Sequence, residues 1–210
     1  MFITLEGGEG SGKSTLLRAL STRLSADGLN VVTTREPGGT PLAEAIRNLA
    51  LHPPGDTSFS PLAEALLMNA ARDDHLKELI RPALKRGDWV LCDRFADSTR
   101  VYQGLAGGIS PSLLQLIEKD VIGPTSPHLT LILDIPVEVA AQRRIDRGAP
   151  VDVFERRDSD FHSNVRSAFL QIADENPMRV KTIDASQSVE KVFETAWALI
   201  SDLRETAANS

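Results

Sequence analysis

The sequence has few of the residues that build disulfide frameworks and metal clusters. Cys92 is its single cysteine, which excludes an intramolecular disulfide framework and a zinc site made of cysteines. The four histidines are scattered, without the spacing of metal ligands. No apolar run approaches the roughly 18 residues that suggest a membrane span, and no basic segment followed by an apolar one precedes Phe2. We therefore expect a cytoplasmic protein without a membrane partner.

Positive charge is also in the minority. Lysine and arginine number 23 against 29 aspartates and glutamates, so the net charge is −6. This balance argues against a broad surface for nucleic acid, and we expect no such partner. With 41% hydrophobic and 25% charged residues, the composition is that of a soluble globular protein. A length of 210 residues suits a single domain over 1–210.

Short apolar runs alternate with longer stretches of helical period. The runs are rich in β-branched residues and predict strands at 2–6, 30–34, 89–92, 129–133 and 179–183. The longer stretches predict helices at 13–26, 41–51, 60–86, 110–122, 137–147, 158–175 and 187–204. Pro82 is expected to kink or split the third of these helices. The alternation favours an α/β fold with an open parallel sheet and right-handed crossovers.

A glycine-rich segment, GGEGSGKST, lies between the first predicted strand and the first predicted helix. Gly7 and Gly12 frame four residues and are followed by Lys13 and Ser14, which is the G-x-x-x-x-G-K-[ST] pattern. Inward-facing backbone N–H groups and the helix N-terminus together hold phosphate oxygens. Lys13 adds charge at the transferring phosphate, and the Ser14 hydroxyl can hold magnesium. The segment therefore predicts a nucleoside triphosphate site, although it contains an acid, Glu9.

Two further segments favour a small-molecule kinase over other P-loop proteins. A switch GTPase would need an Asn-Lys-x-Asp string, which is absent, and a DNA-translocating ATPase usually has more chain and more basic surface. In TREPGGT (34–40), Arg35 can face an anion, and a solvated arginine at a strand-to-helix turn is the alternative interpretation. In CDRF (92–95), Asp93 follows a buried strand, where P-loop proteins place the carboxylate that steers magnesium, and Arg94 can bridge phosphates.

The segments EGGEGSGKST, TREPGGT, AARDDH and DRFADSTRVYQG, in this order and spacing, resemble the bacterial thymidylate kinase family. The resemblance runs across nearly the whole chain and includes TIDASQ near residue 184. It implies a P-loop kinase fold, with a five-stranded parallel sheet flanked by helices. It also implies a magnesium-dependent homodimer that transfers the γ-phosphate of ATP to dTMP, giving dTDP for DNA synthesis.

The resemblance implies a role for each matching residue. Glu9 would contact the sugar 3′-hydroxyl and the solvent around magnesium, and Arg72 would read the thymine carbonyl. Tyr102 would lie under the deoxyribose and disfavour a 2′-hydroxyl. The expected catalytic residues are Lys13, Asp93, Arg94, Arg143, Arg147 and Arg156, and the metal site is Ser14, Asp93 and Glu9. The expected ATP site is Gly7, Gly8, Glu9, Gly10, Ser11, Gly12, Lys13, Ser14, Thr15, Asp184 and Ala185. The expected dTMP site is Glu9, Arg35, Pro37, Arg47, Met68, Arg72, Arg94, Thr99, Tyr102 and Gln103.

The chain departs from the family at two positions. Met68 stands where the family usually has a phenylalanine that stacks on thymine, and methionine has no flat stacking face. Val153 stands in Asp-Val-Phe-Glu, where members without an arginine in the phosphate loop commonly have Asp-Arg-x-Glu. Arg156 or Arg157 would have to supply the missing charge.

An arginine-rich segment over about 142–162 is expected to form a closing lid. Arg143 and Arg147 are four residues apart and would share a helix face, while Gly148 and Pro150 would end that helix. A solvated, salt-bridged helix pair is the alternative interpretation. For the chain as a whole, another nucleoside or deoxynucleoside monophosphate kinase remains an alternative because of Met68. A nucleotide-binding regulatory protein with low turnover is a second alternative, because of Val153.

Overall fold

The computed structural model describes residues 1–55, 57–148 and 158–208 of the chain. The strands are β1 (Phe2–Glu6), β2 (Val31–Arg35), β3 (Trp89–Asp93), β4 (Leu129–Asp134) and β5 (Val180–Asp184). The longer helices are α1 (Lys13–Ala26), α2 (Pro41–Leu51), α3 (Pro61–His75), α6 (Pro111–Ile122), α7 (Val137–Arg147), α8 (Ser159–Glu175) and α9 (Val189–Ala208). The shorter helical segments are η1 (Leu76–Ile80), α4 (Arg81–Lys85), α5 (Ala96–Thr99) and η2 (Arg100–Leu105).

The strands form one parallel five-stranded sheet in the order β2-β3-β1-β4-β5, which confirms the predicted sheet. Leu5 of the central strand lies opposite Asp93 of β3 and opposite Leu131 of β4. The carboxyl ends of β1 and β3 therefore meet at one edge of the sheet, where ligands bind in open α/β folds. The phosphate loop begins directly after β1, at this edge.

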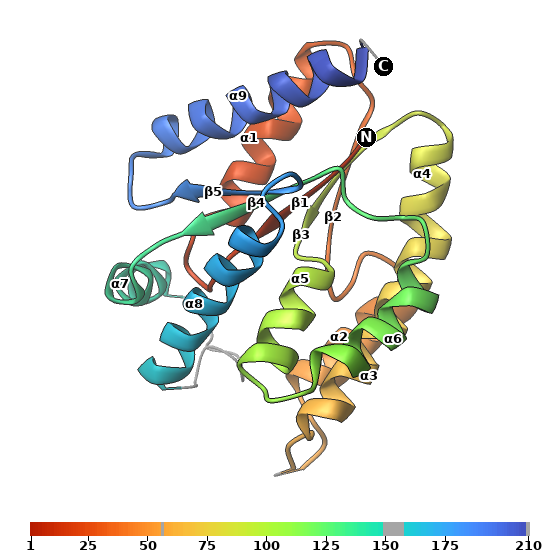
Figure 1. Cartoon of the computed structure of the whole chain (residues 1–210), viewed down its shortest axis with the longest axis vertical. Coiled ribbons are helices and arrows are strands. Elements are labelled where there is room, and N and C mark those ends of the chain that lie inside the picture. The colour runs from red at the N-terminus through yellow and green to blue at the C-terminus, as the bar shows by residue number, and fades with distance from the viewer. Residues whose placement is uncertain (56, 149–157, 209–210) are drawn as a thin grey trace.

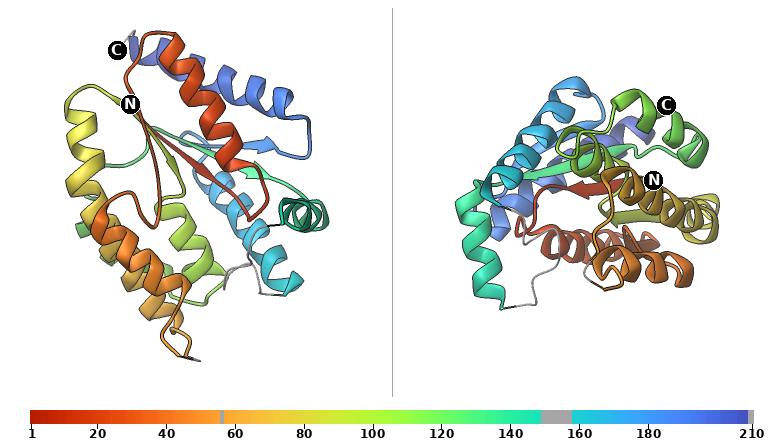
Figure 2. Two further views of the ribbon diagram at one scale, coloured as in Figure 1. Left: turned by 180° about the vertical axis from the view of Figure 1, so that it is seen from behind. Right: turned by 90° about the horizontal axis from the view of Figure 1, so that it is seen from below.

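Helices cover both faces of the sheet, as the two further views confirm (Figures 1 and 2). Helices α1 and α9 pack together on one face, where their leucines and isoleucines bury against the strands. Helix α8 and the α5–η2 segment cover the other face, and Phe169 packs there with Tyr102 and Val165. All five residues of β1 are buried, as expected for a strand covered on both faces.

The structure confirms one detail of the predicted helices and adds another. The predicted helix over 60–86 is divided into α3, a π-helical turn η1 and the short α4. Pro82 lies in the first turn of α4, where its missing N–H cannot continue the α-helical ladder of the preceding turns. The segment Ala96–Leu105, which has no clear helical period, forms α5 and η2.

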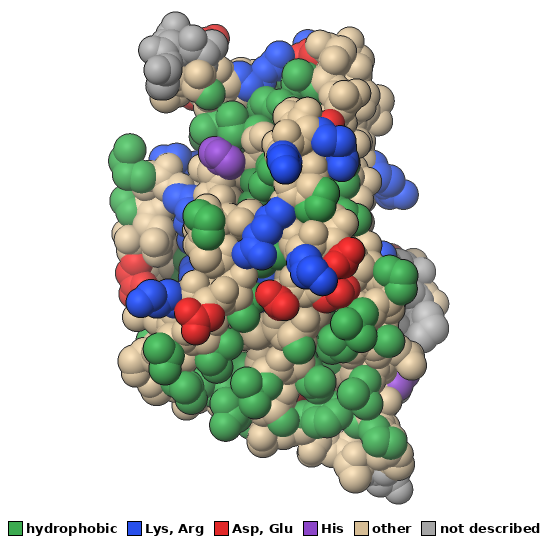
Figure 3. All heavy atoms as spheres, turned by 90° about the vertical axis from the view of Figure 1, so that its right-hand side faces the viewer, with side chains coloured by type: hydrophobic (Ala, Val, Ile, Leu, Met, Phe, Trp, Pro, Cys, Tyr) green, Lys and Arg blue, Asp and Glu red, His purple; other side chains and the backbone are tan. Residues whose placement is uncertain are grey.

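One side of the molecule exposes many apolar side chains (Figure 3). This side includes α3 and α6, which pack against each other. Their exposed leucines are Leu62, Leu66, Leu113 and Leu116. Within the part of the chain that the structure describes, no helix has the length and apolarity needed to cross a bilayer.

Candidate active site

The phosphate loop has the backbone that its glycines predict. Gly12 adopts a left-handed conformation with φ of 96° and caps α1, which begins at Lys13. Gly10 has φ of +81°, and a Cβ there would lie 2.6 Å from the Ala140 carbonyl oxygen of α7. No other residue type could adopt this conformation without displacing α7. The loop therefore packs tightly against the helix that begins the arginine-rich segment.

The Lys13 side chain lies inside the loop. Its Nζ donates to the carbonyl oxygens of Gly7 at 3.1 Å and Gly8 at 2.9 Å. Burial lowers the pKa of Lys13, and the nearby Arg94 lowers it further, while Glu9 acts in the opposite direction. The lysine charge is thus held at the centre of the loop, within reach of a phosphate bound there.

Ser14 and Asp93 form the oxygen pair expected to hold magnesium. The Ser14 hydroxyl donates to Asp93 Oδ2 at 2.9 Å, because β1 and β3 are neighbours in the sheet. In the described ranges, no group of three or more His, Cys, Asp or Glu residues could hold a metal ion. A P-loop magnesium does not need such a cluster, because phosphate oxygens and waters supply the other ligands. One hydroxyl and one carboxylate fit this donor set.

Glu9, the acid in the loop, is paired with Arg94. The Arg94 guanidinium donates to Glu9 Oε1 at 2.6 Å and to the Tyr102 hydroxyl at 3.3 Å, and lies 5.1 Å from the centre of the Tyr102 ring. Burial opposes the charge of Arg94, but Glu9 and neighbouring acids hold its pKa well above the ordinary value. The negative charge of Glu9 is therefore compensated by an arginine beside the loop.

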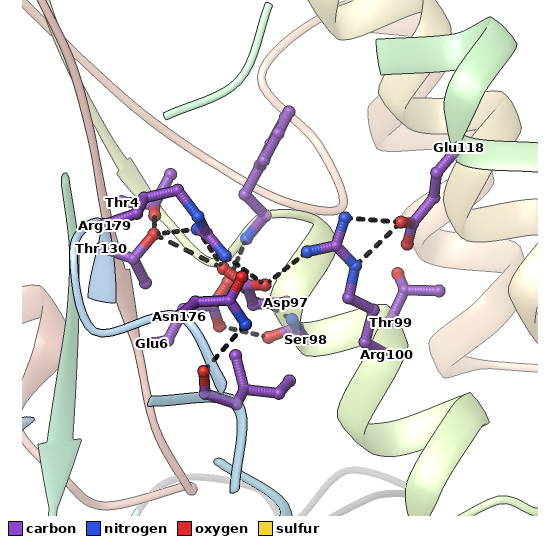
Figure 4. Close-up of polar contacts among 12 residues, drawn as sticks. Thr4, Glu6, Asp97, Ser98, Thr99, Arg100, Glu118, Thr130, Asn176 and Arg179 are labelled. Carbon is purple, nitrogen blue, oxygen red and sulfur yellow. Dashed lines mark hydrogen bonds and ion pairs between the residues drawn. The ribbon is translucent and has the colours of Figure 1, made fainter. Parts of the chain in front are cut away.

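The Arg94 backbone is strained, and its side chain is fixed from a second direction. Its φ of 70° is rare for a residue with a Cβ, and such strain persists where surrounding contacts enforce it. Its Nη1 also donates to Ser98 Oγ at 3.0 Å, and Ser98 in turn donates to Glu6 Oε2 at 2.6 Å. Glu6 accepts from the Phe95 backbone N–H at 2.8 Å as well. Glu6 thus anchors the start of α5 beneath the site (Figure 4).

The same helical segment is anchored by buried ion pairs on its other side (Figure 4). Asp97 accepts from Arg179 at 2.7 Å and from Arg100 at 2.8 Å, and Arg100 pairs with Glu118 of α6 at 2.7 Å. Burial alone would raise the pKa of Asp97, but Arg179 and Arg100 outweigh it and lower the pKa. These pairs explain why a segment of weak helical period is helical here.

A pocket beside Arg94 brings together most of the predicted dTMP site. Its empty volume is about 580 Å³, open solvent at its mouth included. The predicted residues that line it are Glu9, Pro37, Arg47, Met68, Arg72, Arg94, Thr99, Tyr102 and Gln103. Glu36, Leu51, Phe95 and Ser98 also line it and were not predicted. Ser98 could have been found from the segment DRFADSTRVYQG, which contains it.

The side chains in this pocket hold one another in place. Arg72 donates to Thr99 Oγ1 at 3.0 Å, and Gln103 donates to Glu64 at 3.0 Å. Burial raises the pKa of Tyr102 to about 12, so its hydroxyl stays protonated and polar. Met68, which replaces the expected stacking phenylalanine, also lines this pocket.

Arg35 and Arg47 take different positions. Arg47 donates to the Pro37 carbonyl oxygen at 3.0 Å and lines both the predicted dTMP pocket and the hollow above the phosphate loop. Arg35 lines only the second of these, and both oxygens of Glu44 accept from it, at 2.8 and 2.9 Å. In this structure, the predicted dTMP pocket does not include Arg35.

A third hollow, on the far side of the phosphate loop, corresponds to the expected place of the donor base. Its lining residues are Gly10, Ser11, Gly12, Thr15, Leu16, Ala19, Leu133, Arg143, Ala185, Gln187, Val189, Val192 and Phe193. Arg143 donates to the Ala185 carbonyl oxygen at 3.0 Å. The Asp184 carboxylate instead accepts from the Ser186 backbone N–H at 2.9 Å and from Gln187 at 2.8 Å, so it shapes the turn.

The structure describes only part of the predicted lid. Arg144, which was not predicted as a site residue, donates to the Glu9 carbonyl oxygen at 3.2 Å. The side chain of Arg147 lies outside the description, and so do residues 149–157 with Val153, Arg156 and Arg157. The roles predicted for them stay predictions.

A pocket of side chains and a phosphate loop thus face each other across Lys13, Asp93 and Arg94. This arrangement, on a five-stranded parallel sheet, defines a P-loop nucleotide kinase. The sequence model of the family described as thymidylate kinase matches residues 5–196. The chain belongs to the thymidylate kinase family, as its sequence predicted.

Individual relatives agree with this assignment. The chain is 51% identical to a thymidylate kinase of Nitrobacter winogradskyi over 209 residues, covering 98% of this chain and 90% of that protein. It is 50% identical to a thymidylate kinase of a Bradyrhizobium species, again over 209 residues, covering 98% and 92%. The crystal structure of thymidylate kinase from Ehrlichia chaffeensis superposes with a TM-score of 0.77 at 36% identity, covering 96% and 98% of the two chains.

Proposed function

We propose that this chain transfers the γ-phosphate of ATP to dTMP, giving ADP and dTDP. The observation that carries the proposal is the position of Arg94. It lines both the pocket that would hold dTMP and the hollow above the phosphate loop that would hold the ATP phosphates. A group shared by the two sites can position the acceptor phosphate beside the donor, which is the main catalytic task in phosphoryl transfer.

The charged groups around this junction have separate tasks. Lys13 neutralises charge on the donor phosphates, and Arg94 and Arg47 hold the phosphate of dTMP. Ser14 and Asp93 would hold Mg²⁺, which when bound neutralises charge on the phosphates and orients them. Their direct contact at 2.9 Å supports this assignment. No covalent intermediate with the protein is required.

Glu9 has a positioning task that does not oppose phosphate binding. Its carboxylate is paired with Arg94 at 2.6 Å and lines the acceptor pocket. A carboxylate in this place can accept a hydrogen bond from the sugar 3′-hydroxyl of dTMP. The ion pair also neutralises part of the Glu9 charge, so the loop keeps a favourable field for phosphate.

An acceptor panel tests the proposal. ADP release should be fastest with dTMP, slower with its ribonucleotide counterpart and with dCMP, and slowest with purine monophosphates. If a ribonucleotide or a purine monophosphate is the best acceptor, the chain is another monophosphate kinase, which is the alternative that Met68 leaves open. If no acceptor gives turnover, the proposal fails altogether.

Tyr102 provides a matched pair for the same panel. Its ring is buried in the pocket and would lie against the deoxyribose. Tyr102→Phe keeps the bulk of the ring and should retain discrimination against the ribonucleotide. Tyr102→Ala opens the space for a 2′-hydroxyl and should lower that discrimination. Equal discrimination in both variants would contradict the steric role of the ring.

The domain organisation and the dimeric state are part of the same proposal. Residues 1–210 act as one domain with a lid over about 142–162, and two copies associate through the face that carries Leu62, Leu66, Leu113 and Leu116. An exposed apolar patch of this kind is typical of a protein–protein contact. Light scattering should give a dimer, and Leu66→Glu with Leu116→Glu should give a monomer. The cytoplasmic location stays a prediction.

A further inference from the structure

Arg72, the residue proposed to read the thymine carbonyl, is almost completely buried. Its side chain is 2% exposed, and it lines the acceptor pocket. Its Nη1 donates to Asn69 Oδ1 at 3.1 Å, its Nη2 to Thr99 Oγ1 at 3.0 Å, and its Nε to Glu36 Oε2 at 2.8 Å. A guanidinium has five N–H donors in a rigid plane, so these three contacts determine where the remaining donors point.

Glu36 connects Arg72 to a second buried side chain. Its other oxygen, Oε1, lies 3.1 Å from Nδ1 of His75, a residue that has no solvent exposure. Glu36 itself is 4% exposed, so its charge is compensated inside the protein by Arg72. His75 is one helical turn after Arg72 on α3, whereas Glu36 comes from the loop after β2. The pair therefore joins two elements of the pocket wall.

The contacts of the His75 ring indicate which nitrogen carries the proton. An ionised carboxylate can only accept, so Nδ1 must donate to Glu36. The other nitrogen, Nε2, lies 2.7 Å from Thr34 Oγ1 and can accept from that hydroxyl. A ring protonated on Nδ1 therefore satisfies the hydrogen bonds of all four groups. The result is a chain of hydrogen bonds from Thr34 through His75 and Glu36 to Arg72.

The loop packs closely against this ring. Gly39 has φ of +89°, and a Cβ there would lie 2.6 Å from His75 Nε2. The second glycine of the TREPGGT segment is therefore required by the position of His75 as well as by the backbone. The ring therefore has little room to rotate, and the Glu36 carboxylate that it holds is restricted in the same way.

We infer that Glu36 and His75 are positioning residues that set the base specificity of the acceptor pocket, by holding the Arg72 guanidinium in the plane that meets an acceptor oxygen of the base. This rests on the proposed function, in which Arg72 reads thymine. Thymine presents a carbonyl oxygen where cytosine presents an amino group. A correctly aimed arginine therefore favours dTMP, and a loosely held one discriminates less.

Two substitutions of His75 separate the two ends of the ring. His75→Asn places an amide near Nδ1 and keeps a donor for Glu36, whereas His75→Gln places its amide near Nε2 and loses that donor. The measurement is the ratio of kcat/KM for dTMP to that for dCMP. His75→Gln should lower the ratio by roughly tenfold, which is the lower end of what a hydrogen bond to a charged group contributes. His75→Asn should retain most of the wild-type ratio.

A merely structural role predicts a different outcome. Loss of folded protein lowers both kcat/KM values equally and leaves their ratio unchanged, so an unchanged ratio in His75→Gln overturns the inference. His128→Gln is the matched control, because His128 Nδ1 accepts from the Phe2 N–H at 3.0 Å at the opposite edge of the sheet. It should leave the ratio at the wild-type value.

Arg72→Lys distinguishes the two levels of the proposal. It keeps the charge but loses the planar fork, and it should lower the ratio at least as much as His75→Gln. If Arg72→Lys leaves the ratio unchanged, the proposed reading of the base fails. If Arg72→Lys lowers it and His75→Gln does not, only the positioning role fails.

The wild-type chain provides a test that needs no variant to fold. In a ¹⁵N-labelled sample, long-range nitrogen–proton correlations should show His75 protonated on Nδ1, and this signal should move when dTMP is added. A ring protonated only on Nε2 would overturn the inference, because no donor would then face Glu36. A signal that ATP moves but dTMP does not would do the same.

Discussion

The donor and acceptor sides of the active site are built from different parts of the chain. On the donor side, the phosphate loop offers backbone groups from consecutive residues, 7–15, and Lys13 is held by the loop's own carbonyl oxygens. On the acceptor side, the pocket gathers side chains from the loop after β2, from α3 and from the α5–η2 segment. The donor side is formed by residues that are neighbours in the chain, whereas the acceptor side is assembled from distant residues by the tertiary structure.

This difference affects how each side responds to substitution. On the acceptor side, charged groups are held by partners from other elements, as in Arg72 with Glu36 and Arg94 with Glu9. Removal of one partner leaves a buried charge without compensation, so its effect extends beyond the residue that is changed. On the donor side, removal of the Lys13 side chain should alter phosphate binding and leave the rest of the fold unaffected.

Lys13→Ala is the strongest test of the donor side. Its charge acts on phosphates, so we expect turnover to fall by roughly 10³-fold or more, with little change in the thermal unfolding midpoint. Steady-state ADP release and a melting curve measure the two effects. Lys191→Ala, on the exposed face of α9, removes a lysine without either effect. A folded Lys13→Ala protein with near-wild-type activity would contradict the kinase assignment.

Alanine variants of the lid arginines come next. Arg143 lines the donor hollow and the phosphate hollow, and charge accumulates on the transferring oxygens as transfer proceeds. Replacement of the arginine that meets this charge by alanine should lower turnover by roughly 10³-fold, with a smaller effect on ATP affinity. Single variants of Arg143, Arg147, Arg156 and Arg157 should therefore divide into strong and weak classes.

Two outcomes sharpen this experiment. If the Arg156→Ala and Arg157→Ala proteins both turn over at the wild-type rate, neither residue compensates for Val153, and the lid acts through Arg143 and Arg147. Arg204→Ala is a suitable control, because this arginine pairs with Asp27, just after α1, at 2.7 Å, away from the site. It should retain wild-type turnover.

Glu6 allows the anchoring of the acceptor side to be tested by pH. Burial raises its pKa to about 7, and Asp97 adds to this shift, while Arg94 opposes it. The folded state therefore binds this proton more tightly than the unfolded state. The stability that Glu6 contributes is complete below the ordinary carboxyl value of 4.5 and is lost as pH rises toward about 7.

The comparison for this test is Glu6→Gln, whose amide does not titrate. The unfolding free energy of wild type minus that of the variant should fall by roughly 3 kcal/mol over this pH window. Denaturant unfolding at several pH values measures the difference. A flat difference for Glu6→Gln would show that Glu6 stays ionised throughout.

Met68→Phe is expected to have the smallest effect, and in the favourable direction. Met68 lines the acceptor pocket, and a phenylalanine there would provide a flat face for the base. We expect KM for dTMP to fall by about two- to tenfold, in line with the contribution of an aromatic pair. Met178→Phe makes the same change at a position that is 91% exposed and should leave KM unaltered. An unchanged KM in Met68→Phe would indicate that the base lies elsewhere in the pocket.

The sequence by itself determined the strands, most of the helices and the phosphate loop. These features depend on residues that are close together in the chain. The strands follow from the pattern of apolar residues, and the loop follows from glycine, lysine and serine at fixed spacing. The family resemblance predicted which distant residues belong to the acceptor site. The turn at Asp184 is also local, since its carboxylate accepts from residues two and three positions ahead.

Only the tertiary structure decided how the charged residues are paired. Glu9 meets Arg94 across 85 residues, and Ser14 meets Asp93 across 79. Period and spacing indicate which face of an element is buried, but they do not indicate which side chain from another element lies opposite. Buried charges need partners, and sheet order and helix packing select those partners. For this reason the Glu36–His75 pair beside Arg72 and the helical α5–η2 segment could not be predicted from the sequence.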